Sequence, residues 1–190
     1  MGLHPIARSH AIAYGACART ELRRPTMNRM IDLLLNVVAK SHLCPRHLRL
    51  AIYRMCGMQI GAADIWPGVA FHGTRCSIGD GSWINCEVYF DCREADVAIG
   101  KNVGVAMRAM FVTSSHEMGT SARRAGIMHY QPITVEDGVW IGARAVILPG
   151  CTVGRGCVVA AGAVVARSCE ANGLYAGVPA KRIRDLACSE

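Results

Sequence analysis

The chain has 190 residues, of which 52% are hydrophobic and 6% aromatic, and its formal net charge is +7. This length suits one domain with an appendage, and the apolar share is ample for a buried core. The positive charge is confined to residues 1–56, which hold nine basic and two acidic residues. Residues 57–190 hold twelve of each sign, so most of the chain is neutral. We therefore expect no nucleic-acid partner.

Ten cysteines in a chain of this length are typical of small disulfide-bonded secreted proteins. However, no two of them have C-x-x-C spacing, and the seven histidines show no metal-ligand spacing, so we expect no metal. The first 30 residues lack the apolar stretch of a signal peptide, and no apolar run approaches the ~20 residues that span a bilayer. The sequence therefore predicts reduced, mostly structural thiols in a cytoplasmic protein.

The N-terminal segment, residues 1–57, is predicted to be basic and partly helical. Residues 1–26 show no clear period. Asn28 can cap a helix that runs to about Lys40, and Pro45 suits the first turn of a second helix. A basic amphipathic helix of this kind can contact a membrane surface, but a helical cap on the repeat region that follows is favoured. The second helix carries Arg46, Arg49 and Arg54.

A six-residue repeat dominates residues 58–167. An aliphatic residue recurs at every sixth position, and an apolar or small residue stands two places before each of these aliphatic residues. A period of six fits neither a helix nor an isolated strand, but it fits a coil of three flat sides with one inward side chain per side. The sequence therefore predicts a parallel β-helix with a continuous apolar column. The repeating residues are Val135, Ile141, Ile147, Val153, Val159 and Val165.

Earlier coils are expected to place their inward residues at Ile60, Trp66, His72, Ile78, Ile84 and Phe90. Three extra residues then shift the register. An extruded loop is expected over residues 117–132, because this stretch lacks the repeat while Phe111 and Val135 remain a multiple of six apart. Residues 168–190 are expected to leave the coil and to form a short basic helix after Pro179.

His116 follows the last strand before this loop, and loops on a rigid scaffold often carry function. The ordinary pKa of histidine, near 6.5, lets it act as a general base at neutral pH. On position alone, a surface or loop-anchoring histidine is the commoner case. Glu117 follows directly and is favoured as an exposed carboxylate, with orientation of the imidazole as the alternative.

Three separated blocks closely resemble the hexapeptide-repeat acyltransferases: residues 132–154 (PITVEDGVWIGARAVILPGCTVG), 158–165 (VVAAGAVV) and 176–181 (AGVPAK). The resemblance covers about residues 58–186 and is strongest to O-acetyltransferases acting on maltose, galactosides and polysaccharides. It implies a left-handed β-helix. It also implies acetyl-CoA as co-substrate and a homotrimer whose active sites lie between subunits.

The resemblance also implies roles for single residues. Thr113-Ser-Ser-His116 matches the family segment whose histidine takes a proton from the acceptor hydroxyl, and the Ala143 N–H matches the oxyanion donor. Asn85 matches an acceptor-binding asparagine, with a corner asparagine bonding its own backbone as the alternative. Asp91 is the best match for an acceptor-binding aspartate, with Glu94 as its rival.

Coenzyme A would lie along the coil faces near Ala143 and Ala161, again by resemblance. Basic side chains near the end of the chain match residues that contact its phosphates. These candidates are Arg167, Lys181 and Arg184.

The N-terminal segment departs from the sugar enzymes, because we find no match to their Tyr-containing acidic acceptor motif in residues 1–57. The acceptor therefore stays open. A serine- or drug-directed acetyltransferase of the same superfamily is one alternative, and a non-catalytic repeat scaffold is another. A γ-type carbonic anhydrase shares the solenoid but needs zinc-binding histidines, which His72, His116 and His129 do not provide.

Overall fold

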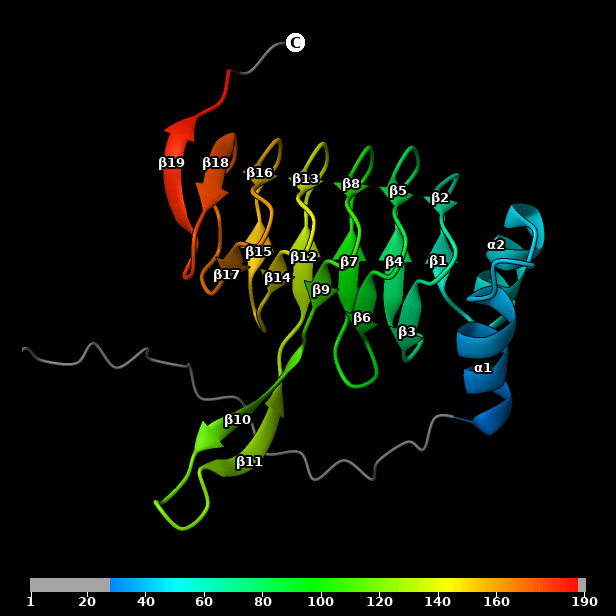
Figure 1. Ribbon diagram of the computed structural model, residues 1–190, viewed down its shortest axis with the longest axis horizontal. Coiled ribbons are helices and arrows are strands. Elements are labelled where there is room, and N and C mark those ends of the chain that lie inside the picture. The colour runs from blue at the N-terminus through cyan, green and yellow to red at the C-terminus, as the bar shows by residue number, and fades with distance from the viewer. Residues whose placement is uncertain (1–27, 188–190) are drawn as a thin grey trace, which may run out of the picture.

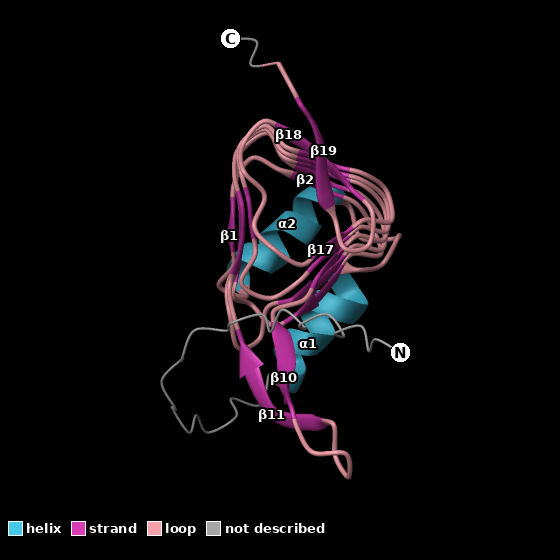
Figure 2. Ribbon diagram, turned by 90° about the vertical axis from the view of Figure 1, so that its left-hand side faces the viewer, coloured by secondary structure: helices cyan, strands magenta, loops and turns pink. Residues whose placement is uncertain are grey.

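The computed structural model describes residues 28–187, so the stretch 1–26, expected to lack a regular pattern, lies outside the described residues. Short strands stack along one axis, with helices at one end and a pair of longer strands at the other (Figure 1). Viewed along that axis, the coil has a triangular outline (Figure 2). The predicted parallel β-helix is confirmed.

Each side of the triangle is a sheet whose neighbouring coil strands pair in parallel. Sheet A contains β1 (Gln59–Ile60), β4 (Cys76–Ile78), β7 (Val97–Ile99), β12 (Ile133–Val135) and β15 (Thr152–Val153). Sheet B contains β2 (Asp64–Ile65), β5 (Trp83–Ile84), β8 (Gly104–Val105), β13 (Trp140–Ile141), β16 (Val158–Val159), β18 (Gly173–Ala176) and β19 (Lys181–Asp185). Sheet C contains β3 (Ala70–His72), β6 (Tyr89–Asp91), β9 (Met110–Phe111), β14 (Val146–Ile147) and β17 (Val164–Val165).

The chain passes from sheet A to B to C in each coil and then returns to A. We call the line of corners between sheets B and C the B–C edge, and the line between sheets C and A the C–A edge. Inward side chains pair in register from coil to coil and fill the centre with apolar groups. On sheet C the rings of Phe71, Phe90 and Phe111 stack, with centroids 4.9 and 4.8 Å apart.

The first coil corrects the predicted register. Ile65 and Phe71 point inward and are fully buried, whereas Trp66 is 51% exposed and His72 is half-buried. The corner between sheets A and B of this coil is a residue short and the corner between sheets C and A is a residue long, so Ile60 and Ile78 still pair in register. A corner can gain or lose a residue without moving the strands on either side, and a strict count of six misses that freedom.

Two helical segments close one end of the coil. The Asn28 side chain accepts the Met30 N–H at 3.0 Å and caps α1 (Arg29–Leu33), which continues as the π-helix η1 (Leu34–Ala39). Pro45 is the capping residue of α2 (Arg46–Met55), not part of its first turn. The ring of Tyr53 packs edge-on against Phe71 at 5.0 Å, so the cap continues the core.

The arginines of α2 bond to the chain itself. Arg49 is 3% exposed and donates to the carbonyls of Ala39, Ser41, Cys44 and Ile65 at 2.7–3.0 Å. Arg46 bonds Asp64, and Arg54 bonds two carbonyls of the first coil. These contacts favour the cap over a membrane-surface helix. No helix among residues 28–187 is long and apolar enough to cross a membrane.

The C-terminal segment corrects two predictions. The coil does not end at residue 167, because Cys169 forms a parallel β-bridge with Val153 and β18 pairs with β16. The expected basic helix is instead the strand β19, which pairs antiparallel with β18. The physical reason is that β18 ends the sheet with unpaired backbone groups, which the tail satisfies by ladder bonds.

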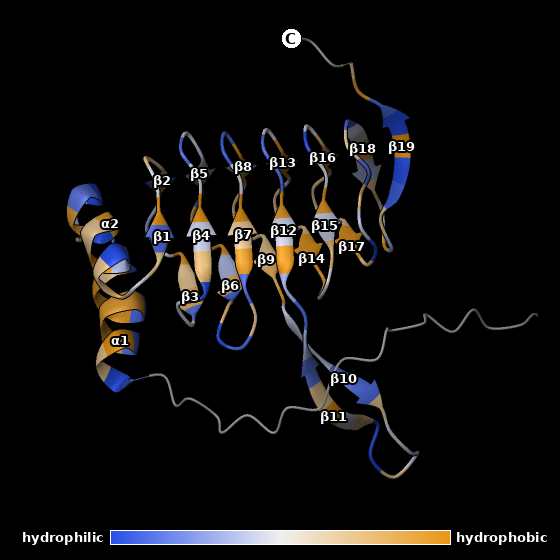
Figure 3. Cartoon of the chain, turned by 180° about the vertical axis from the view of Figure 1, so that it is seen from behind, coloured by the Kyte–Doolittle hydropathy of each residue, from blue (hydrophilic) through white to orange (hydrophobic). Residues whose placement is uncertain are grey.

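The stretch predicted as an extruded loop, residues 117–132, lies largely within a β-hairpin. Its strands β10 (Ser114–Met118) and β11 (Ala125–Tyr130) pair only with each other and project from the C–A edge, between β9 and β12 (Figures 1 and 2). The Gln131 N–H donates to the Thr113 carbonyl at 2.9 Å and closes the base. Hydrophobic residues concentrate in the coil strands and hydrophilic ones in β10 and β19 (Figure 3).

Candidate active site

His116 stands on the hairpin with its ring exposed to solvent. Its Nδ1 lies 3.0 Å from the carbonyl oxygen of Gly126 on the opposite strand. A carbonyl only accepts hydrogen bonds, so Nδ1 carries the proton and Nε2 keeps its lone pair. A backbone carbonyl therefore orients the imidazole, and Glu117 is an exposed carboxylate. This arrangement gives a base whose free nitrogen points away from its anchor.

Asp91 lies directly below the hairpin and contacts its own chain. Its side chain accepts the Ser114 hydroxyl at 2.6 Å and the Ser114 N–H at 3.1 Å, and its carbonyl accepts the Thr113 hydroxyl at 2.8 Å. Asp91 is 7% exposed. The structure therefore engages it inside the chain, although the sequence predicted that it faces an acceptor. Glu94, its predicted rival, is half-buried on the following loop.

Asn85, Ala143 and Ala161 share the B–C edge, each in the corner that follows a strand of sheet B. The Asn85 side chain accepts the N–H of Cys86 at 2.7 Å, which is the corner role weighed as its alternative. Within the described part of the chain, the Ala143 N–H donates no hydrogen bond. A Cβ on Gly142 would lie 2.5 Å from the Ala161 nitrogen, so adjacent coils touch here.

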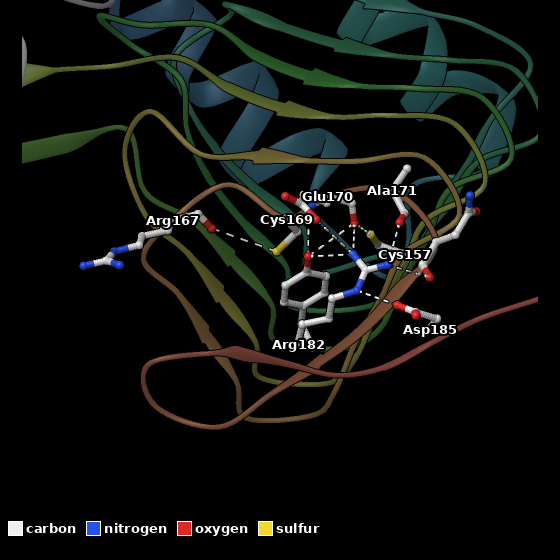
Figure 4. A network of polar contacts seen from close by, with 9 residues as sticks. Cys157, Arg167, Cys169, Glu170, Ala171, Arg182 and Asp185 are labelled. Atoms are coloured by element: carbon white, nitrogen blue, oxygen red, sulfur yellow. Dashed lines mark hydrogen bonds and ion pairs between the residues drawn. The ribbon is translucent and has the colours of Figure 1, made fainter.

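The predicted phosphate contacts fall in three places. Lys181 pairs with Ala176 beside the B–C edge, whereas Arg184 pairs with Leu174 further along sheet B. Arg167 follows β17 on the C–A edge, and its guanidinium points away from the tail (Figure 4). All three side chains are exposed.

Arg182, which sequence reasoning missed, fixes the tail strand. Its guanidinium donates to the Tyr175 hydroxyl at 3.1 Å, to the Asp185 carboxylate at 2.8 Å and to three backbone carbonyls of the last turn (Figure 4). Lys181 and Arg184 are also basic, so the pattern KRIRD gave no signal that Arg182 differs from them.

One chain does not bring all the predicted site residues together. His116 is on the C–A edge, whereas Asn85 and Ala143 are on the B–C edge, and sheet C lies between the two edges. A side of about five residues spans roughly 16 Å. The base and the predicted oxyanion donor are therefore separated by the width of a sheet within one chain.

Burial makes several of the described thiols poor nucleophiles. Eight of the ten cysteines lie in the described residues, and these eight are free. Burial raises the pKa of Cys92 and of Cys169 to about 12, and it raises the pKa of Cys76 well above its usual value. Thiols with such pKa values carry little thiolate at neutral pH. Among residues 28–187, no group of three His, Cys, Asp or Glu side chains could hold a metal ion.

Comparison with known proteins identifies the family. The family described as bacterial transferase hexapeptide (six repeats) matches residues 132–167. A Schizosaccharomyces pombe protein named as an acetyltransferase is 33% identical over 184 residues, covering 95% of this chain and 86% of the relative. Galactoside O-acetyltransferase of Escherichia coli is 30% identical over 129 residues, which cover 58% of this chain and 64% of that enzyme.

A solved structure shares the architecture. The hexapeptide-repeat acetyltransferase from Vibrio cholerae in complex with acetyl-CoA superimposes with a TM-score of 0.74 at 29% identity, covering 84% of this chain and 88% of the other. The predicted left-handed parallel β-helix is thereby confirmed as the fold class. From the repeat, the architecture and these matches together, the chain belongs to the hexapeptide-repeat acetyltransferase family.

Proposed function

We propose that the protein transfers the acetyl group of acetyl-CoA to a hydroxyl of a sugar or a related small molecule, with His116 as general base. The observation that carries the proposal is the bond from His116 Nδ1 to the Gly126 carbonyl, because it leaves Nε2 free to take a proton. The Vibrio cholerae structure contains acetyl-CoA, and the Escherichia coli relative is a galactoside O-acetyltransferase. Both support the assignment of substrates.

The chain's groups suit each step of the transfer. An alcohol is a weak nucleophile at neutral pH, so His116 Nε2 takes the hydroxyl proton as the acceptor oxygen attacks the thioester carbonyl. The negative charge that develops on the carbonyl oxygen accepts a hydrogen bond from the free Ala143 N–H. The C–S bond then breaks, and His116 returns the proton to the thiolate. The products are an acetyl ester and the thiol of coenzyme A.

A homotrimer completes the site in this proposal. If sheet C faced a threefold axis, the C–A edge of one copy would meet the B–C edge of the next, and His116 would approach the neighbour's Ala143. The outward face of sheet C supports this packing, because its side chains form an apolar row in register along the axis. The row consists of Ala70, Tyr89, Met110, Val146 and Val164.

Coenzyme A would then lie along the groove between two copies. On the B–C edge, Ala143 and Ala161 leave room for a ligand to reach the backbone, and Lys181 stands at the end of the same edge. Arg167 would face the groove from the neighbouring copy. Arg184, being further along sheet B, is the more distant candidate for a phosphate contact.

Substitution of the base tests the proposal. We expect His116→Ala to lower kcat by about 100-fold or more, because a positioned base contributes roughly 10²–10⁴-fold. The KM for acetyl-CoA should change less than twofold. Thiol release from acetyl-CoA would be followed with maltose and methyl galactosides as acceptors.

The matched control is Glu117→Gln, which alters the exposed neighbour and should retain wild-type turnover. Wild-type kcat in His116→Ala would refute the proposed base. Failure of the wild-type protein to acetylate any sugar hydroxyl in an acceptor screen would refute the substrate class.

A further inference from the structure

We propose that Asp91 is a positioning residue for His116, holding the base of the hairpin at the height at which the imidazole can work. The inference rests on the proposed role of His116. The family resemblance matched Asp91 to acceptor binding. We infer that Asp91 instead fixes the position of His116 through hydrogen bonds within the same chain.

The contacts gather where the chain leaves the coil. The Asp91 side chain binds both the hydroxyl and the N–H of Ser114, and its carbonyl binds the Thr113 hydroxyl. Thr113 is fully buried and Asp91 nearly so. A buried carboxylate is costly unless hydrogen bonds compensate for its lost water, and bonds to an ionised acceptor are the stronger kind. The two bonds to the carboxylate, together with the bond from Thr113 to the backbone carbonyl, therefore form a strong local anchor, which we call the Asp91 clamp.

The hairpin needs such an anchor. Beyond Thr113 the strands β10 and β11 pair only with each other, and nearly all their residues are exposed or half-buried. A lone two-stranded hairpin is marginally stable in water, so its orientation depends on what fixes its base. His116 is two residues from Ser114, and such residues project from the same face of a strand. A tilt at Ser114 would therefore move the imidazole directly.

The other carboxylate oxygen faces His72. Its Oδ1 lies 3.8 Å from Nδ1 of His72, too far for a direct hydrogen bond. The guanidinium of Arg93 contacts the opposite ring nitrogen of His72. A guanidinium only donates, so His72 Nε2 accepts and Nδ1 presents its N–H toward Asp91. One oxygen of the Asp91 carboxylate thus faces the N–H dipole of His72, and the other accepts the hydroxyl and the N–H of Ser114.

Hydrogen exchange and kinetics of the full-length protein test the clamp together. In Asp91→Ala and in Ser114→Ala we expect the backbone amides of β10 and β11 to exchange about tenfold faster. The kcat should fall about 10- to 100-fold, because small misplacements of a reacting group are costly. The KM for acetyl-CoA should stay within twofold, since the B–C edge is untouched. Maltose and methyl galactosides serve as acceptors.

Conservative and control variants separate positioning from general damage. Ser114→Thr keeps the hydroxyl and should retain at least half of kcat, and Asp91→Asn keeps one acceptor oxygen and should be intermediate. Asp96→Ala removes an exposed ion pair with Arg75 from the loop that follows β6, so both exchange and kcat should stay at wild-type values. Ser114→Ala removes one small side chain and tests the clamp even if Asp91→Ala does not fold.

Two results would overturn the inference alone: unchanged hairpin exchange in Ser114→Ala, or faster exchange with unchanged kcat while His116→Ala is inactive. Wild-type turnover in His116→Ala would instead refute the proposed base, and this inference would fall with it. The two failures are thereby distinguishable.

Discussion

Arg49 is a fully charged side chain inside the N-terminal cap. It donates four hydrogen bonds to carbonyls from the end of η1, the following turn and the first coil, so one side chain joins three segments. The sequence placed Arg49 with Arg46 and Arg54 as one basic group on the second helix. Helical spacing cannot show that carbonyls from other segments converge on one of the three, because that depends on how η1 ends.

Removing this guanidinium should be much more costly than removing its exposed neighbour. We expect Arg49→Ala to lower the free energy of unfolding by about 3 kcal/mol or more, because several buried carbonyls lose their donors. Arg46→Ala, which removes an exposed ion pair with Asp64, should cost about 1 kcal/mol or less. Urea denaturation of both variants would measure the difference. Equal losses would contradict the structural role given to Arg49.

Among the elements, the C-terminal strand pair β18 and β19 brings Lys181 to the B–C edge. The strand β19 lies on β18 because Arg182 ties the last turn to Tyr175 and Asp185. Lys181 thereby stands beside the corner that follows β18, in line with Ala143 and Ala161. A helix in this place would have distributed the basic residues around its axis, whereas the strand puts Lys181 and Arg184 at different distances from the edge.

The position of Lys181 leads to a kinetic expectation. Lys181→Ala should raise the KM for acetyl-CoA several-fold and leave kcat nearly unchanged, because a phosphate contact far from the reacting carbonyl contributes equally to the ground state and the transition state. Lys101→Ala, an exposed lysine at a corner between sheets A and B, is the matched control. Steady-state kinetics with varied acetyl-CoA would check it. An unchanged KM in Lys181→Ala would leave the lysine without a role in binding.

The coil strands could be predicted from the sequence wherever an inward side chain on each side of the coil has to fill an interior of fixed size. The column from Val135 to Val165 therefore followed directly from the sequence. Trp66 and His72 were assigned inward because corner lengths are free to compensate, and no local signal marks which corner is short. His116 was predicted from its motif. The Asp91 clamp was not, because Asp91 and Ser114 meet only when two coils stack.

At the scale of the whole molecule, the three sheets differ in the faces that they turn outward. The outward row of sheet C is apolar, whereas that of sheet A is small and polar. Sheet A presents Gln59, Ser77, Ala98, Thr134 and Thr152. An apolar row in water favours association, which supports sheet C over sheet A as the face that the proposed trimer would bury.

A charge placed on each face should separate them. Met110→Lys puts an ammonium in the middle of the sheet C row, and burying it unpaired in an interface is costly. We expect this variant to sediment as a monomer and to lose activity, since His116 and Ala143 would no longer meet. Thr134→Lys, on the outward face of strand β12 in sheet A, should sediment as wild type. A trimeric Met110→Lys variant in analytical ultracentrifugation would contradict the proposed packing.

The hairpin enters and leaves the coil at neighbouring rungs, closed by the bond from Gln131 to Thr113. Its length is consequently independent of the core, which continues in phase on either side. Evolution can lengthen, shorten or exchange this segment without repacking a single inward residue. The coil is in this sense a constant scaffold, and the hairpin of residues 114–130 can change in length and sequence without a change in the core.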